Sequence, residues 1–181
     1  MKLFITRHGQ TDMNVKEQVS GITEAQLTET GLKQAEELAR LLKKNKEQNN
    51  IEYIYVSPLI RARKTAEPIE EALGLKAEVD DRLMEMNFGI FEKRSWTHNA
   101  EFRTARSNPL YHFPEGESFI DVIHRGYNII EDVEKKRAGH NVLFVCHNTI
   151  SRALSTYFND YTIEELNNWK MDNCQLYKFD L

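Results

Sequence analysis

Two histidines and two arginines stand just beyond the ends of three apolar segments of the sequence: Arg7 and His8, Arg61, and His147. Each of them alone is more commonly a solvated or structural side chain than a catalytic one. Arginine binds phosphate bidentately through its planar guanidinium group and stays charged. A neutral histidine can attack phosphorus when an acceptor holds its other ring nitrogen, and a second, protonated histidine can stabilise the phosphoryl oxygens. Brought together, the four residues are suited to phosphoryl transfer through a phosphohistidine.

Such a transfer also needs an acid for the leaving oxygen. Glu85 lies between Met84 and Met86, and apolar neighbours favour the protonated form of a carboxyl group. The alternative is a surface glutamate in a loop. Zinc-dependent hydrolysis fits less well, because no HExxH motif and no cluster of carboxylates accompanies the histidines.

Strand and helix patterns alternate along the chain. Strands are expected at 3–5, 53–56, 77–79, 142–146 and 175–179. Helices are expected after the N-cap residues Thr28 and Ser118, over 59–73, and over about 149–158 and 163–169. This order predicts an α/β sandwich with a largely parallel sheet. Ligands of such sheets bind beyond the carboxyl ends of the strands, where the two histidines and two arginines would meet.

Residues 82–117 show no strong periodicity. A chain of 181 residues favours a single domain, 1–181, in which this stretch is interpreted as a lid or substrate loop. Lys93 and Arg94 are interpreted as solvated surface charges, with a rim that attracts a second anionic group as the alternative. The aromatic side chains of the stretch are expected to pack onto the core rather than face a substrate: Phe91, Trp96, Phe102, Tyr111 and Phe113.

Composition narrows the class of protein. Lys and Arg sum to 24 and Asp and Glu to 28, and this net charge of −4 argues against nucleic-acid or acidic-membrane partners. No apolar run approaches the roughly 20 residues of a membrane span, and the apolar start of the chain is too short for a signal peptide. Cys146 and Cys174 are expected to be buried, reduced thiols. A cytoplasmic protein is therefore expected.

Six segments in order resemble the motifs of the histidine phosphatase superfamily, which includes the cofactor-dependent phosphoglycerate mutases. Arg7-His8-Gly9 lies within the first of them, and together the segments are 6–14, 27–35, 57–66, 82–89, 114–118 and 145–147. The resemblance runs from about residue 2 to residue 180. It implies a three-layer α/β/α sandwich of the phosphoglycerate mutase-like kind, with neither metal nor cofactor.

The resemblance also implies roles for individual residues. His8 would be the phosphorylated nucleophile, and Glu85 would be the proton donor and then the base for water. Arg7, Arg61 and His147 would hold the phosphoryl group. Substrate or phosphate contacts would come from Asn14, Ser20, Gly21 and Asn148.

Several positions depart from the usual family pattern. Gln10 stands where Glu is frequent, and Met13 where Trp is frequent. Asn148 and Thr149 replace a common Gly-Gly pair, and the Asn148 amide could itself contact the phosphate. These changes put the shape of the substrate pocket in doubt more than the chemistry.

A phosphomonoesterase for a small phosphorylated metabolite is the predicted function. A phosphoglycerate mutase is the alternative; it is disfavoured because the last predicted strand leaves almost no C-terminal tail of the kind that the mutases carry. A non-catalytic phospholigand-binding module is a minor alternative, since both nucleophile and acid are present. A homodimer is possible, and the sequence does not choose among sugar phosphates, α-ribazole phosphate, phosphoglycerates and phosphoproteins.

Overall fold

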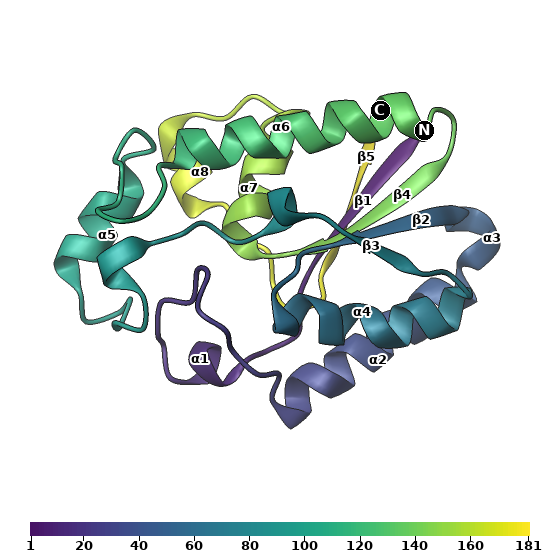
Figure 1. The fold of residues 1–181 in the computed structure, drawn as a ribbon, viewed down its shortest axis with the longest axis horizontal. Helices are drawn as coiled ribbons and strands as arrows, with labels where there is room; N and C mark the ends of the chain where they lie inside the picture. Colours follow the sequence, from purple (N-terminus) through teal and green to yellow (C-terminus); the bar gives the residue numbers. More distant parts are fainter.

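Five strands form one mixed sheet at the centre of the protein, and the computed structural model describes residues 1–181 (Figure 1). The strands are β1 (Lys2–Arg7), β2 (Ile51–Val56), β3 (Ala77–Val79), β4 (Asn141–Cys146) and β5 (Leu176–Asp180). They lie in the order β3-β2-β4-β1-β5. All neighbouring pairs are parallel except β1 and β5, which are antiparallel. The predicted, largely parallel sheet is confirmed, with β5 as an antiparallel edge.

Eight helices surround the sheet: α1 (Asp12–Val15), α2 (Glu29–Lys44), α3 (Lys46–Asn49), α4 (Ile60–Leu73), α5 (Ala100–Ser107), α6 (Phe119–Lys136), α7 (Asn148–Ser155) and α8 (Ile163–Asn168). Two N-cap predictions are confirmed. The Thr28 hydroxyl accepts from the Gly31 N–H at 3.0 Å, and the Ser118 hydroxyl accepts from the Asp121 N–H at 3.2 Å. None of the helices combines the length and the apolar character that crossing a membrane requires.

Helices cover both faces of the sheet. Figure 1 shows α2 and α4 on one side and α6 and α7 on the other. Side chains alternate along each strand, so Phe4 and Leu143 pack toward α2 and α4, whereas Ile5 and Phe144 pack toward α6 and α7. The expected three-layer α/β/α sandwich is thereby confirmed.

The segment 82–117 is more regular than its sequence suggests. It contains two 3-10 turns, Asp81–Leu83 and Gly89–Phe91, and the helix α5, which the sequence analysis missed. The rings of Phe88, Phe91, Phe102 and Phe113 pack with centroids 5.3–5.9 Å apart. The expected packing of the aromatic residues therefore occurs, with the partly buried Trp96 and Tyr111 against the same cluster. The expectation that none of them faces a substrate holds only in part, because Trp96 and Phe102 also line the cavity described below.

Candidate active site

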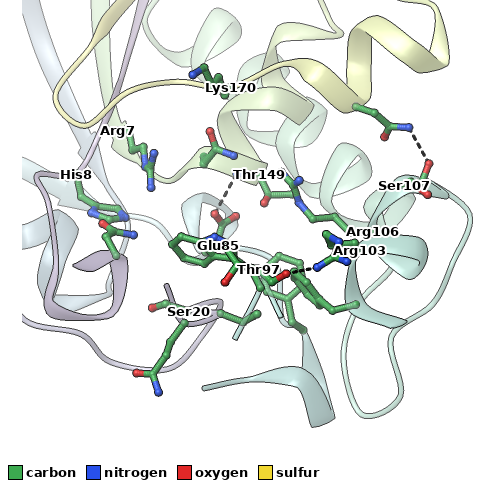
Figure 2. A pocket seen from close by; sticks show the side chains of 18 residues that line it. Arg7, His8, Ser20, Glu85, Thr97, Arg103, Arg106, Ser107, Thr149 and Lys170 are labelled. Carbon is green, nitrogen blue, oxygen red and sulfur yellow. Dashed lines mark hydrogen bonds between the residues drawn. The ribbon is translucent and has the colours of Figure 1, made fainter. Parts of the chain in front are cut away.

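The site lies at the carboxyl ends of β1, β2 and β4. Backbone bonds hold these ends together, because the His8 N–H donates to the Cys146 carbonyl at 3.0 Å and the Ser57 N–H donates to the Val145 carbonyl at 3.1 Å. A cavity of about 720 Å³ opens beside them (Figure 2). The sheet thus brings the candidate residues to one edge, as the parallel topology predicts.

His8 lines this cavity and is almost fully buried. Its Nδ1 lies 2.7 Å from the carbonyl oxygen of Gly9. A carbonyl only accepts, so the network assigns the proton to Nδ1 and leaves Nε2 with a free lone pair. Burial, with the nearby charges of Arg61 and Arg7, holds the His8 pKa well below its usual value. His8 is therefore a neutral imidazole with its reactive nitrogen fixed.

The turn after His8 is tightly held. The Gly9 N–H donates to the Thr65 hydroxyl at 3.0 Å, and that hydroxyl donates to the Arg61 carbonyl at 2.7 Å. A Cβ at Gly9 would lie 2.4 Å from the backbone oxygen of Gly31. Only glycine therefore allows the close approach that places its carbonyl against the ring of His8.

His147 is fully buried, with its ring centroid 5.1 Å from that of His8. The Arg61 Nε–H donates to His147 Nδ1 at 3.1 Å, so the proton resides on Nε2, which lies 2.7 Å from the Ser57 hydroxyl. Burial and the Arg61 charge hold the pKa of His147 well below its usual value. The expectation of a protonated second histidine is wrong for this structure, because a buried guanidinium occupies the nitrogen that would take the proton.

Arg61 is buried behind His8 rather than in the cavity wall. Besides its bond to His147, its Nη1 donates to the Thr23 carbonyl at 2.8 Å, and its Nη2 donates to the carbonyls of Gly21 at 2.6 Å and Ser20 at 3.3 Å. Burial lowers its pKa to about 10, so the group remains charged at neutral pH. Arg61 thereby ties the loop at residues 20–23 to His147.

Arg7 lines the cavity and holds an unused donor. One Nη1 hydrogen goes to the Met171 carbonyl at 2.8 Å, whereas its buried Nε–H has no partner. Burial lowers its pKa. A buried N–H without a partner is costly unless a ligand completes it, and a phosphoryl oxygen would do so.

Glu85 also lines the cavity and is almost fully buried. Its Oε1 accepts from the N–H groups of Met86 at 2.9 Å and Ile150 at 3.2 Å, and its Oε2 accepts from the Thr149 N–H at 2.9 Å. The apolar environment predicted from its sequence neighbours is therefore wrong, because three backbone N–H groups face its oxygens, two of them from the start of α7. Arg125 fixes the same segment by donating to the Glu85 carbonyl at 3.1 Å.

The remaining expected site residues divide into two groups. Asn14, Ser20 and Asn148 line the cavity. The Asn148 side-chain oxygen accepts from the Met171 N–H at 2.9 Å, which leaves its NH₂ group for a ligand. Gly21, like Arg61 and His147, does not line the cavity but supports its wall.

Glu92 is a structural residue that the sequence reading missed. Its carboxylate accepts from the N–H groups of Gly21, Ile22, Thr23 and Phe88 at 3.0–3.3 Å. A carboxylate that collects four N–H groups fixes the loop whose carbonyls hold Arg61. Nothing in the local sequence marks it, since the loop lies about 70 residues earlier in the chain.

Three cations of the cavity wall were also missed: Arg103 and Arg106 of α5, and Lys170. Arg103 and Arg106 are three residues apart, a spacing that places two side chains on the same face of a helix. The sequence did not predict α5, so this shared face was not recognised. The residues proposed for a cationic rim, Lys93 and Arg94, are exposed and lie outside the cavity. Their interpretation as surface charges agrees with the structure.

Comparison with known proteins gives a consistent picture. A "Putative phosphoserine phosphatase 2" of Hydrogenobacter thermophilus is 36% identical over 178 residues, which cover 95% of this chain and 85% of the relative. A "Probable phosphoglycerate mutase" of Yersinia enterocolitica is 30% identical over 186 residues, covering 99% and 85%. The crystal structure of the α-ribazole phosphatase from Shigella flexneri superposes with a TM-score of 0.84 at 27% identity, covering 100% and 91%.

The motifs quoted from the sequence and the arrangement of His8, His147 and their arginines agree with these similarities. The sequence model of the histidine phosphatase superfamily (branch 1) matches residues 3–181. The chain belongs to the histidine phosphatase superfamily, and it is a hydrolase of the phosphoglycerate mutase-like kind.

Proposed function

We propose that this protein hydrolyses small phosphorylated metabolites through a phosphohistidine formed on Nε2 of His8. The observation that carries the proposal is the state of His8: neutral, buried at the cavity wall, and locked through Nδ1 so that only Nε2 can react. The phosphatase relatives support a phosphomonoester as substrate.

The first step joins the Nε2 lone pair to phosphorus while the ester P–O bond breaks. Glu85 gives its proton to the departing oxygen. The free Nε–H of Arg7 donates a hydrogen bond to a phosphoryl oxygen. The NH₂ groups of Asn14 and Asn148, which line the same cavity, are further donors for the phosphoryl group.

In the second step a water attacks phosphorus as the P–N bond breaks. The Glu85 carboxylate takes the proton of that water, and His8 returns to its neutral form. Arg61 and His147 act from behind His8. Neither lines the cavity. Four of the five N–H groups of Arg61 bond within the protein, so Arg61 supports the phosphoryl site through its charge and through its bonds to His147 and to the loop at residues 20–23.

The test is phosphate release from a panel of phosphorylated metabolites by the wild type, His8→Ala and His124→Ala. His124 lies on α6, outside the cavity, and serves as the matched histidine control. The proposal predicts that the wild type and His124→Ala release phosphate and form a trapped, acid-labile phosphoenzyme. It predicts that His8→Ala neither releases phosphate nor forms the phosphoenzyme. Release by His8→Ala would refute the nucleophile. Each assay is run with and without EDTA, and inhibition by EDTA would refute independence from metals.

Phosphoglycerate mutase activity is the second candidate, supported by the 30% identical relative with that name. The same samples are incubated with 3-phosphoglycerate. Formation of 2-phosphoglycerate much faster than phosphate release would place the mutase first. The phosphatase assignment predicts the reverse.

Three further expectations belong to this proposal. Residues 82–117 form the substrate-facing wall of a single domain. The edge strands β3 and β5 leave backbone groups unpaired, which suits a homodimer. Both cysteines are free, as in proteins of the reducing cytoplasm. Light scattering of the purified protein tests the dimer, and cell fractionation tests the location.

A further inference from the structure

Arg106 is a half-buried cation of the cavity without a protein partner. It lines the cavity from α5, and its guanidinium makes no hydrogen bond or ion pair within the chain. Figure 2 shows Arg106 and Arg103 across the cavity from Arg7 and His8, with Glu85 between them. A cation placed in this way is stabilised only when an anion completes it.

The surroundings of Arg106 increase this need. Burial lowers its pKa, and Glu85 is the only acidic residue in the cavity lining. Arg152 lies behind it, with a buried Nε–H that also has no partner, and its pKa falls to about 10 through burial and the charge of Arg106. Two neighbouring guanidinium groups, with Glu85 as the one carboxylate whose charge acts on both, leave an excess of positive charge at this end of the cavity.

The phosphoryl group does not account for this region. Its expected position is beside Nε2 of His8, where Arg7 offers the free N–H and Glu85 faces the leaving oxygen. Arg106 lies on the far side of Glu85 from that position (Figure 2). The phosphoryl site and the positive region are two ends of one cavity of about 720 Å³, a size that suits a small metabolite.

We propose that the natural substrate carries a second anionic group, a carboxylate or another phosphate, which Arg106 binds together with Arg103. This inference rests on the proposed phosphatase function and narrows its substrate class. The exposed Arg103 forms the outer part of the subsite, and the half-buried Arg106 forms its inner part. A planar guanidinium binds either anion through two parallel hydrogen bonds.

The test compares substrates that differ only in the second anion. One pair is 3-phosphoglycerate and glycerol 3-phosphate, and a longer pair is fructose 1,6-bisphosphate and fructose 6-phosphate. The quantity measured is the ratio of kcat/KM within each pair. The wild type should favour the member with the second anion about tenfold or more in at least one pair, as expected for a hydrogen bond to a charged group.

Arg106→Gln should lower that ratio about tenfold, and Arg40→Gln should leave it unchanged. Arg40 is an exposed arginine of α2, outside the cavity. Thermal unfolding checks that Arg106→Gln is folded. If it is not, Arg103→Gln on the exposed side of the same helix replaces it, with a smaller fall expected.

The outcomes separate this inference from the phosphatase assignment. A wild type without preference in either pair, or a ratio unchanged by both arginine variants, overturns the second-anion subsite while hydrolysis stands. No phosphate release from any substrate overturns the phosphatase function, and the subsite falls with it.

Discussion

Replacing Glu92 by glutamine tests whether the loop behind the active site depends on one carboxylate. In the wild type, Oε1 accepts from the N–H groups of Gly21, Ile22 and Phe88, and Oε2 accepts from Gly21 and Thr23. Glu92→Gln keeps the shape of the side chain but replaces one oxygen by an NH₂ group. When the NH₂ group takes the place of Oε2, it faces the N–H group of Thr23, and two donors cannot bond to each other. The bond to Thr23 is therefore lost, whereas Gly21 can still donate to the remaining oxygen.

The size of the effect follows from these bonds. A hydrogen bond to a charged group contributes about 1.5–3 kcal/mol and a neutral one about 0.5–1.5 kcal/mol. Three bonds weakened by about 1 kcal/mol each and one bond lost would cost more than 4 kcal/mol in a dry site. Glu92 is half-buried, so water compensates in part. We expect a loss of about 2–4 kcal/mol in the free energy of unfolding, or roughly 6–12 °C in Tm.

Activity should fall as well, because the loop carbonyls orient Arg61, and Arg61 orients His147. A small displacement of such groups costs about tenfold or more in kcat. The assays are urea unfolding and steady-state phosphate release, with Glu36→Gln as the control. Glu36 is an exposed glutamate of α2 that makes no side-chain contact to the loop.

If Glu92→Gln is as stable as Glu36→Gln, within about 0.5 kcal/mol, the claim that the Glu92 carboxylate fixes the loop at residues 20–23 is refuted. Lower stability with unchanged kcat would refute only the link from the loop to the catalytic groups.

Three other predictions follow from the site. Ser57→Ala removes the acceptor of the His147 Nε2–H and should lower stability by about 1–3 kcal/mol, measured by urea unfolding; no loss would contradict the assigned tautomer. Glu85→Gln should lower kcat/KM, which reports the steps up to phosphorylation of His8, by about 10²–10⁴-fold for a poor leaving group, but much less for p-nitrophenyl phosphate, whose leaving group needs no acid; equal losses of kcat/KM on both substrates would argue against the acid role. The folded-state pKa values of His8 and His147 lie well below 6.5, so the unfolded chain binds more protons as pH falls below that value. The free energy of unfolding should therefore reach its full value above pH 6.5 and decline below that pH. The decline should be shallower in His147→Gln than in the wild type, and equal slopes in the two proteins would contradict the lowered pKa of His147.

Much of the site was predictable because it follows the strands. Arg7, His8 and His147 directly follow β1 and β4, and strand ends in a parallel sheet meet without any need for local signals. Thr28 and Ser118 were recognisable as N-caps because capping depends on residues only three positions apart. Sequence is most informative where the interacting groups are close along the chain or are carried by the sheet.

The features that were missed depend on distant contacts. The helix α5 has eight residues and only Phe102 and Ala105 as buried positions, too few for a periodic pattern. The bonding of Glu92 spans about 70 residues. The neutral state of His147 depends on the Nε–H of Arg61 and the hydroxyl of Ser57, which precede it by 86 and 90 residues. Neither a side chain's partner at such separations nor the protonation that the partner imposes is visible in a single sequence.

The tautomers of His8 and His147 differ in how many substitutions elsewhere in the chain they tolerate. His8 is oriented by the main-chain oxygen of Gly9, so its tautomer requires glycine at that one position and no particular side chain as the acceptor. His147 is oriented by the side chains of Arg61 and Ser57, and either can be lost in one codon change. The nucleophile is thus protected by the backbone, whereas its neighbour depends on particular residues. A lineage that leaves this chemistry would be expected to change first around His147, with the turn at His8 still intact.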